Sequence, residues 1–220
     1  LFFFFYAILM SILYQHLCLK LLNIINKVFG LIVIIIISLT SCRKTPITIP
    51  APLQPKPIVE MTYTNLNNRE IKYQQSGATL DVNNDNRADL FFGVQLVGDQ
   101  INAVDKRQFI VVSSINTFLA VNLNEQILPL SQNDSIKLEN FNGSNWYNAS
   151  EIILMERNEF ATGTILWRGN WVDRGKRYMP FQIYKNDQRY NGWIELTADK
   201  EAEKIILHRM AISKEAEKNI

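Results

Sequence analysis

Beyond Val59 the chain consists of short runs of strand-forming residues separated by asparagine, aspartate, glycine and serine. No long stretch of this region keeps the spacing of apolar residues that an amphipathic helix needs. Short runs bounded by turn-forming residues are typical of strands that pair with their neighbours in an antiparallel sheet. The pattern therefore predicts one all-β domain over residues 59–220, a length that suits a sizeable core.

The expected strands are residues 59–63, 71–74, 89–96, 108–113, 118–122, 151–155, 163–168, 177–184 and 189–197. The last two should form a hairpin closing around Asn186 and Asp187, because both residue types tolerate a left-handed backbone. Residues 204–212 should be the final strand. A helical or frayed tail should follow it, because the Lys-Glu-Ala-Glu-Lys run favours a short C-terminal helix.

The first 41 residues are much more apolar than the rest and look like a processing signal. Lys27 precedes an apolar run at residues 28–37. Such a run covers only about half a bilayer as a helix, since roughly 20 residues are needed to span one. Residues 1–41 are therefore predicted to be a signal peptide.

The beginning of the chain carries a second apolar stretch. Residues 1–19 start at Leu1 instead of methionine and contain Gln15 and His16. We expect a misassigned start, because initiation at Leu22 from an alternative codon would give a leader of ordinary length. The alternative is a hairpin of two membrane spans, which the polar residues make less favourable.

Leu39-Thr40-Ser41-Cys42 directly follows the apolar run of the leader. These four residues resemble the lipobox of bacterial lipoproteins, which has an aliphatic residue, two small residues and a cysteine. The resemblance implies that Cys42 takes a diacylglyceryl group on its thiol and that a peptidase cuts before it. Two or three acyl chains hold a protein at a membrane, at about 0.8 kcal/mol per buried methylene. The alternative is a plain transmembrane anchor with a chance cysteine.

The residues after Cys42 suggest where the anchored protein resides. Arg43 and Lys44 stand where the best-known sorting rule needs an aspartate to keep a lipoprotein at the inner membrane, so we expect the outer membrane. Residues 42–58 contain five of the seven prolines. Such a segment should be an extended tether with a rise of about 3.1 Å per residue.

Composition excludes several classes of function. Only Lys20 and Lys27 of the 23 basic residues precede Cys42, so 21 basic residues face 21 acidic residues in the rest of the chain. A nucleic-acid partner is not expected, because such binders carry a basic excess. The predicted domain has no cysteine beyond Cys42 and only one histidine, His208. This excludes an internal disulfide, a thiolate zinc site, a cysteine nucleophile, histidine-based catalytic triads and metal sites with two histidines.

The end of the domain carries Lys176-Arg177-Tyr178 and Tyr190-Asn191-Gly192-Trp193, followed by an isoleucine-rich run. It is similar to the closing strands of small secreted bacterial β proteins, which have a Tyr-Gly-Trp-like pattern there. The resemblance implies an antiparallel β-sandwich and no particular activity. Asn191 interrupts the triplet, which marks either a β-bulge or an accidental match.

An acidic loop at residues 81–89 has a specific chemical interpretation. It resembles the calcium loops of EF-hand-like and related extracellular repeats, where alternate residues supply oxygen ligands. The candidate ligands are Asp81, Asn83, Asp85, the backbone carbonyl of Arg87, and Asp89. Asn86 replaces the usual glycine and Phe92 replaces the final glutamate, so a shorter repeat-type loop with a structural calcium ion is expected. A solvated turn is the alternative.

Aromatic residues provide the candidates for ligand binding. Trp146, Tyr147 and Trp171 fall in polar loops and are expected to be exposed, whereas Trp167 and Trp193 fall in expected strands and should be core. We expect a non-catalytic structural or interaction domain of the cell envelope, attached to a membrane by lipid. Its partner would be a glycan or an envelope protein.

One alternative is a carbohydrate-binding lipoprotein that uses its exposed aromatic residues. A second is a glycoside hydrolase that uses a pair of carboxylates. The carboxylates available for such a pair are Glu151, Glu156, Glu159, Asp173 and Glu195.

Overall fold

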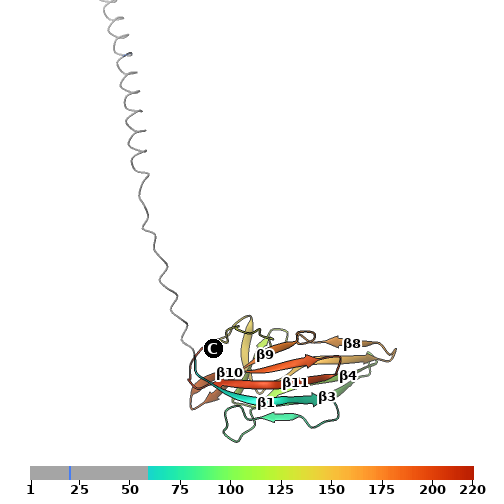
Figure 1. The fold of residues 1–220 in the computed structure, drawn as a ribbon. Coiled ribbons are helices and arrows are strands. Elements are labelled where there is room, and N and C mark those ends of the chain that lie inside the picture. Colours follow the sequence, from blue (N-terminus) through green and yellow to red (C-terminus); the bar gives the residue numbers. More distant parts are fainter. Residues whose placement is uncertain (1–19, 21–58) are drawn as a thin grey trace, which may run out of the picture. The chain divides into compact units, whose positions relative to one another are not determined.

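The computed structural model of the chain describes Lys20 and residues 59–220 (Figure 1). The predicted leader, the lipidation signal with Cys42 and the proline-rich tether lie outside the described residues. No helix of the described part is long and apolar enough to cross a membrane. The strands are β1 (Met61–Lys72), β2 (Ala78–Leu80), β3 (Leu90–Asp99), β4 (Val104–Ser113), β5 (Thr117–Asn122), β6 (Ser144–Asn148), β7 (Glu151–Phe160), β8 (Ile165–Arg168), β9 (Lys176–Lys185), β10 (Gln188–Asp199) and β11 (Lys204–Ser213).

These strands form two sheets in which every neighbouring pair is antiparallel. The six-stranded sheet has the order β1-β11-β10-β9-β5-β6, and the five-stranded sheet has the order β2-β3-β4-β7-β8. Figure 1 shows β1, β11 and β10 side by side. The sheets pack face to face, which confirms the predicted all-β sandwich.

The main core lies between the sheets and draws on alternate residues of the strands. Phe92 and Phe109 come from the five-stranded sheet, and Phe181 and Leu207 from the six-stranded one; all four are fully buried. Burying side chains of this size stabilises the fold by about 1.5–3 kcal/mol each. The core therefore joins the two sheets through one contiguous cluster of buried side chains.

The predicted hairpin around Asn186 and Asp187 is confirmed. Their φ angles are 52° and 59°, and Lys185 pairs with Gln188 across the turn. The expected strands 59–63 and 71–74 are one strand, β1, whose register shifts between Asn65 and Arg69 opposite β11. The short strands β2 and β6 were not predicted, since three and five residues offer too little alternation to detect.

The C-terminal helix that the lysine- and glutamate-rich run favours does not form. Strand β11 matches the expected final strand, and residues 214–220 follow it without helix. The Nη2 of Arg189 donates to Glu217 at 2.7 Å, and Asn191 Nδ2 donates to the carbonyl of Lys218 at 2.9 Å. Local helix propensity is weak compared with such tertiary contacts, so the tail adopts the shape of the surface beneath it.

Asn191 does not mark a bulge. The register between β9 and β10 runs unbroken through the pair Asn191 and Gln182, whose side chains share a hydrogen bond of 2.9 Å. The register instead shifts where β10 pairs with β11, because Glu195 and Leu196 pair with Arg209 and Leu207 and leave His208 as an extra residue of β11. Asn191 is fully buried because its amide connects the sheet to the tail.

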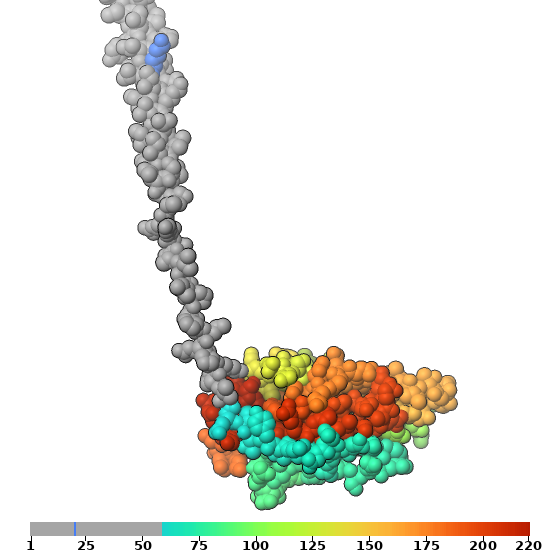
Figure 2. All heavy atoms as spheres, viewed as in Figure 1, coloured from blue at the N-terminus to red at the C-terminus, as the bar shows by residue number. Residues whose placement is uncertain are grey.

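A second, smaller core covers part of the outer face of the six-stranded sheet. Ala120 of β5 is buried there with three residues of the long connection between β5 and β6: Leu130, Ile136 and Phe141. Part of this connection is the yellow-green segment along the upper edge of the domain in Figure 2. Ile220 pairs with Ile136 through backbone hydrogen bonds of 2.7 and 2.9 Å, so the tail holds the connection in place.

Candidate functional site

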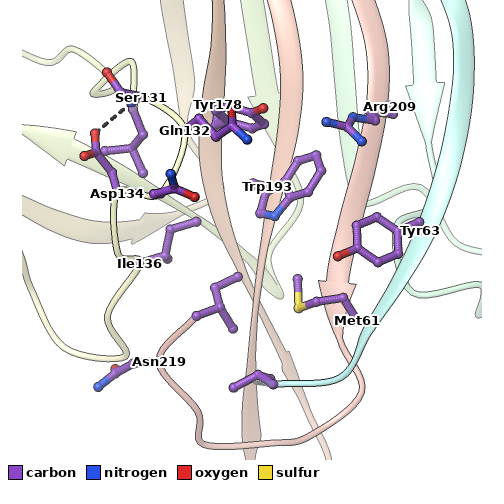
Figure 3. Close-up of a pocket in the computed structure, with 14 residues that line it drawn as sticks. Met61, Tyr63, Ser131, Gln132, Asp134, Ile136, Tyr178, Trp193, Arg209 and Asn219 are labelled. Atoms are coloured by element: carbon purple, nitrogen blue, oxygen red, sulfur yellow. Dashed lines mark hydrogen bonds between the residues drawn. The ribbon is translucent and has the colours of Figure 1, made fainter. Parts of the chain in front are cut away.

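A cleft of about 540 Å³ opens on the outer face of the six-stranded sheet, where the β5–β6 connection and the tail meet strands β1, β11, β10 and β9 (Figure 3). This size falls in the range of roughly 300–1,000 Å³ that is usual for small-molecule sites. We call it the aromatic cleft. It is lined by Val59, Met61, Tyr63, Leu130, Ser131, Gln132, Asn133, Asp134, Ile136, Tyr178, Trp193, Arg209, Asn219 and Ile220.

Strand register explains the floor of the aromatic cleft. Tyr63 of β1 and Trp193 of β10 both pair with Ala211 of β11, so all three side chains share one face of the sheet. Ala211 is small and fully buried, so the two aromatic rings meet above it. In the adjacent row, Arg209 pairs with Glu195, which pairs with Tyr178 of β9.

The aromatic rings of the floor contact one another edge to face. The Trp193 ring centre lies 5.1 Å from that of Tyr178, at 87° between planes, and 6.1 Å from that of Tyr63, at 64°. The guanidinium carbon of Arg209 lies 5.5 Å from the Trp193 ring centre. Figure 3 shows Trp193 between Tyr63 and Arg209 on one side and the loop on the other. Tyr63 remains 64% exposed, so the floor presents apolar ring surface to solvent.

A charged pair is built into the floor of the cleft. Glu195 is only 5% exposed, and its carboxylate accepts hydrogen bonds from Arg209 Nε at 2.7 Å and Tyr178 Oη at 3.0 Å. Burial alone would raise the pKa of Glu195, but the bonds from Arg209 and Tyr178 outweigh burial and lower it. The carboxylate therefore stays ionised and neutralises Arg209.

The loop wall of the cleft is polar. Ser131, Gln132, Asn133 and Asp134 are all exposed, and Asp134 Oδ2 accepts a hydrogen bond from the Ser131 backbone at 2.7 Å (Figure 3). This bond closes the turn, in which Asn133 has a φ of 72°. Asn219 faces the cleft from the tail, while its Oδ1 accepts from the backbone of Leu138 at 2.8 Å.

The acidic loop of residues 81–89 connects β2 to β3. The carboxylate of Asp81 accepts hydrogen bonds from the backbone of Asp85 at 3.1 Å and of Asn86 at 2.7 Å. Asp85 Oδ1 accepts from the backbone of Arg87 at 2.9 Å. Asn86 has the left-handed backbone, with a φ of 65°, that its position requires in place of glycine. These hydrogen bonds between the Asp81 and Asp85 side chains and the loop backbone hold the loop in a curved conformation.

Asp89 ends the loop inside the protein. It is 5% exposed, and its Oδ2 accepts a hydrogen bond from the Val82 backbone at 2.8 Å. Burial raises the pKa of Asp89, the bond from Val82 opposes this, and the negative charges of Asp85 and Asp81 raise it further. An ionised Asp89 therefore costs stability, and a bound cation would offset that cost.

Asn83 tests whether this loop suits a metal ion. Its side-chain Oδ1 is buried and accepts no hydrogen bond. Within the described residues, no three Asp, Glu, His or Cys side chains gather closely enough to hold a metal. The three carboxylates of the predicted set, Asp81, Asp85 and Asp89, are therefore not gathered as a metal cluster, and the other two donors are an amide oxygen and the Arg87 carbonyl, which suit calcium. The orphaned oxygen of Asn83 fits the predicted ligand set of Asp81, Asn83, Asp85, Arg87 and Asp89.

Trp171 lies in a different environment from the one predicted. The sequence predicts an exposed side chain, but Trp171 is fully buried and its Nε1 donates to the carbonyl of Ile127 at 3.1 Å. Its turn begins at Gly169, whose φ of 115° and closeness to the Leu154 backbone hold the turn against the core. A Cβ at Gly169 would lie 2.5 Å from the Leu154 carbonyl oxygen. Trp171 is therefore a core residue and has no surface to offer a ligand.

The other predicted binding residues, Trp146 and Tyr147, lie on β6 outside the cleft. Trp146 is half-buried against Phe141, with ring centres 5.6 Å apart, and its Nε1 donates to the carbonyl of Lys137 at 3.3 Å. Tyr147 is 50% exposed, as predicted. Trp167 packs against the main core and is half-buried.

Trp193 departs from its prediction in the opposite direction to Trp171. It was predicted to be a core residue, but it lines the aromatic cleft. Along β10, Ile194 and Leu196 are fully buried in the main core, and Gly192 contacts Phe181. Strand alternation then puts Trp193 on the opposite face. This period-two pattern is visible in the sequence and could have placed Trp193 outside the core. Tyr63, Tyr178, Arg209 and the 131–134 loop carry no comparable local signal.

The carboxylates considered for a hydrolase do not gather in the cleft. Glu151, Glu156 and Glu159 belong to β7 of the other sheet, Asp173 pairs with Lys200 at 2.6 Å, and Glu195 alone lies under the cleft floor. A general acid needs a raised pKa, whereas that of Glu195 is lowered. Comparison of the chain with protein-family models, with curated proteins and with solved structures found no match.

Proposed function

We propose that this chain is a lipid-anchored, non-catalytic interaction domain of the bacterial cell envelope. In this proposal acyl chains on Cys42 hold the domain at the outer membrane, the aromatic cleft receives a ligand, and calcium braces the acidic loop. The aromatic cleft carries the interaction role, because it presents Tyr63 and Trp193 to solvent beside a polar wall. Aromatic side chains of this kind dominate recognition surfaces.

The electrostatics of the cleft support binding in preference to catalysis. Glu195 is engaged by Arg209 and Tyr178, and Asp134 closes its own loop. A glycoside hydrolase needs one protonated and one ionised carboxylate flanking the bond to be cut. The lowered pKa of Glu195 suits it to hold Arg209 in place and makes it a poor proton donor.

The anchor is tested by exchanging Cys42 for serine in the full chain. The wild-type protein should fractionate with the outer membrane and incorporate labelled palmitate, whereas Cys42→Ser should do neither. A matched control is Cys18→Ser, which removes the other cysteine of the chain and should leave both properties intact. Wild-type protein recovered among cytosolic proteins, without label, would contradict the anchor.

Calcium binding is favoured by the buried, unpaired Oδ1 of Asn83 and by the raised pKa of Asp89. A ligand that binds only the folded state stabilises it, so millimolar calcium should raise the melting temperature of the full chain in detergent. Asp85→Ala should abolish the rise. Asp134→Ala is the matched control, since it also removes a single side-chain bond to the backbone of a surface loop. Identical wild-type melting curves in calcium and in chelator would remove the calcium site.

A further inference from the structure

We propose that the aromatic cleft binds an uncharged oligosaccharide, with a sugar ring lying on the floor formed by Trp193 and Tyr63. This inference rests on the proposed interaction role and specifies its ligand. It differs from the sequence-based candidates, since Trp146, Tyr147 and Trp171 take no part in lining the cleft.

The floor suits a molecule that can pack one apolar face on exposed aromatic carbon. Tyr63 and Trp193 stand two strands apart, and their rings meet edge to face over the buried Ala211, with centres 6.1 Å apart. A pyranose presents C–H groups on its face, which pack on aromatic carbon, and hydroxyls at its rim. The volume of about 540 Å³ leaves room for more than a single small solute, within the usual range for ligand sites.

The charges of the cleft favour a neutral ligand over an anionic one. Among the described residues that line it, Arg209 is the one cationic side chain, and its Nε already donates to Glu195 at 2.7 Å. Phosphate or carboxylate ligands need a free cationic fork, because such bonds supply most of their affinity. The acidic side chain of the wall, Asp134, accepts a backbone hydrogen bond from Ser131. Asp134 keeps its charge, because no cationic side chain of the described residues pairs with it, so the cleft carries one uncompensated negative charge, which disfavours an anionic ligand.

The wall supplies polar groups that the protein does not use itself. The exposed side-chain amides of Gln132 and Asn133 make no hydrogen bond to the described protein. A planar amide offers a donor and an acceptor side by side, which matches neighbouring hydroxyls of a sugar. Water-exposed partners of this type add orientation more than affinity.

A peptide is disfavoured by the backbone of the floor. Strands β11, β10 and β9 each pair with a strand on both sides, so their main-chain groups are engaged in the sheet. Peptide recognition by sheets relies on free main-chain groups at an edge. Only β1, at the margin of the cleft, is an edge strand, so recognition over β11, β10 and β9 has to come from side chains, which is how hydroxyl-rich ligands are bound.

The test uses the full chain in a detergent without a sugar headgroup, titrated with short neutral malto-, cello-, manno- and xylo-oligosaccharides. Binding is followed by calorimetry and by tryptophan fluorescence. Tyr63→Ala should weaken binding at least tenfold, which corresponds to about 1.4 kcal/mol. Tyr147→Ala is the matched control, because this tyrosine is also exposed on an edge strand of the same sheet, and it should change nothing.

Both tyrosines are largely exposed, so neither substitution should lower the melting temperature appreciably. Failure of the whole panel to bind, or equal weakening by both substitutions, overturns the proposal. A parallel titration uses an aromatic-rich peptide and a sulfated oligosaccharide. Binding of either that Tyr63→Ala abolishes would leave the interaction role standing while removing the neutral sugar. No effect of Tyr63→Ala on any probe would remove both.

Discussion

The acidic loop and the aromatic cleft are assembled in opposite ways. All five candidate calcium ligands lie within nine consecutive residues, from Asp81 to Asp89. The cleft gathers side chains from β1, β9, β10 and β11, the β5–β6 connection and the tail, more than a hundred residues apart in the chain. A local site can be recognised before folding, whereas a distributed site exists only once the sheet has set its register.

The two sites also differ in what their side chains do for the fold. Carboxylates of the acidic loop bond to its own backbone, so changes there act first on stability. Tyr63 and Gln132 of the cleft contribute little to the core and remain exposed, so changes there act first on binding. Substitutions that separate stability from binding therefore test the distinction directly.

The largest effect is expected at Trp171, which the sequence groups with exposed binding residues. Trp171→Ala removes a fully buried ring and its hydrogen bond to Ile127, so it should lower the free energy of unfolding by about 3–5 kcal/mol. Denaturant unfolding measures this loss. The folded fraction should keep its affinity for any cleft ligand. A loss of affinity without a loss of stability would contradict the core role of Trp171 and support a role in ligand binding.

A smaller and calcium-dependent effect is expected at Asp89. Asp89→Asn keeps an acceptor for the Val82 backbone and removes a buried charge. In chelator it should raise the melting temperature, by a few degrees for each 1 kcal/mol gained. In calcium it should be the less stable protein, because one carboxylate ligand is missing. Thermal melts in both buffers show whether the ranking reverses, and an unchanged ranking would count against the ion.

The pH dependence of that difference has a definite sign. Because burial raises the pKa of Asp89 above 3.8, the folded protein holds this proton more tightly than the unfolded chain does. Protonation of Asp89 therefore stabilises the folded state, and its ionisation as the pH rises through the raised pKa destabilises it. In chelator, the advantage of Asp89→Asn should be largest near neutral pH and should vanish as the pH falls towards 3.8. Melts across this range measure it, and an advantage that grows with acidity would be the wrong sign.

The smallest effect is expected at Asn83. Asn83→Ala deletes the buried oxygen that has no partner, so stability in chelator should stay within about 0.5 kcal/mol of wild type or rise. The rise in melting temperature with calcium should nevertheless shrink. Asn84→Ala, a neighbouring change in the same loop with a φ of 56° at that position, serves as a comparison for backbone strain alone. An undiminished calcium response in Asn83→Ala would exclude this oxygen as a ligand.

The sequence carried most of the strand pattern, because Asn186, Asp187 and the apolar runs are local signals. The conformation of the C-terminal tail could not be predicted in the same way. Residues 214–220 favour a helix in isolation, yet Arg189 and Asn191 bind them to the sheet in a bent, non-helical conformation. Tertiary contacts of this kind connect distant segments and leave no trace in local composition.

The same reasoning explains the tryptophans. Trp171 sits among polar neighbours, and its burial depends on how the Gly169 turn meets the Leu154 backbone in another strand. Trp193 could have been placed by counting alternate residues along β10. Its neighbours across the sheet, Tyr63 and Arg209, could not have been placed in this way, because β1 and β11 are far apart in the sequence and pair only in the folded protein.

The fold constrains the strands of the cleft more tightly than it constrains the loop that forms its wall. Strands β1, β9, β10 and β11 must keep their register for the sandwich to exist, which constrains the rings they carry. The side chains of Gln132 and Asn133 meet no such demand, because they bond to no other described residue, although the φ of 72° at Asn133 favours asparagine or glycine there. Under the proposed binding role, substitutions at Gln132 would change ligand preference while the domain keeps folding, so sequence divergence among relatives should concentrate there.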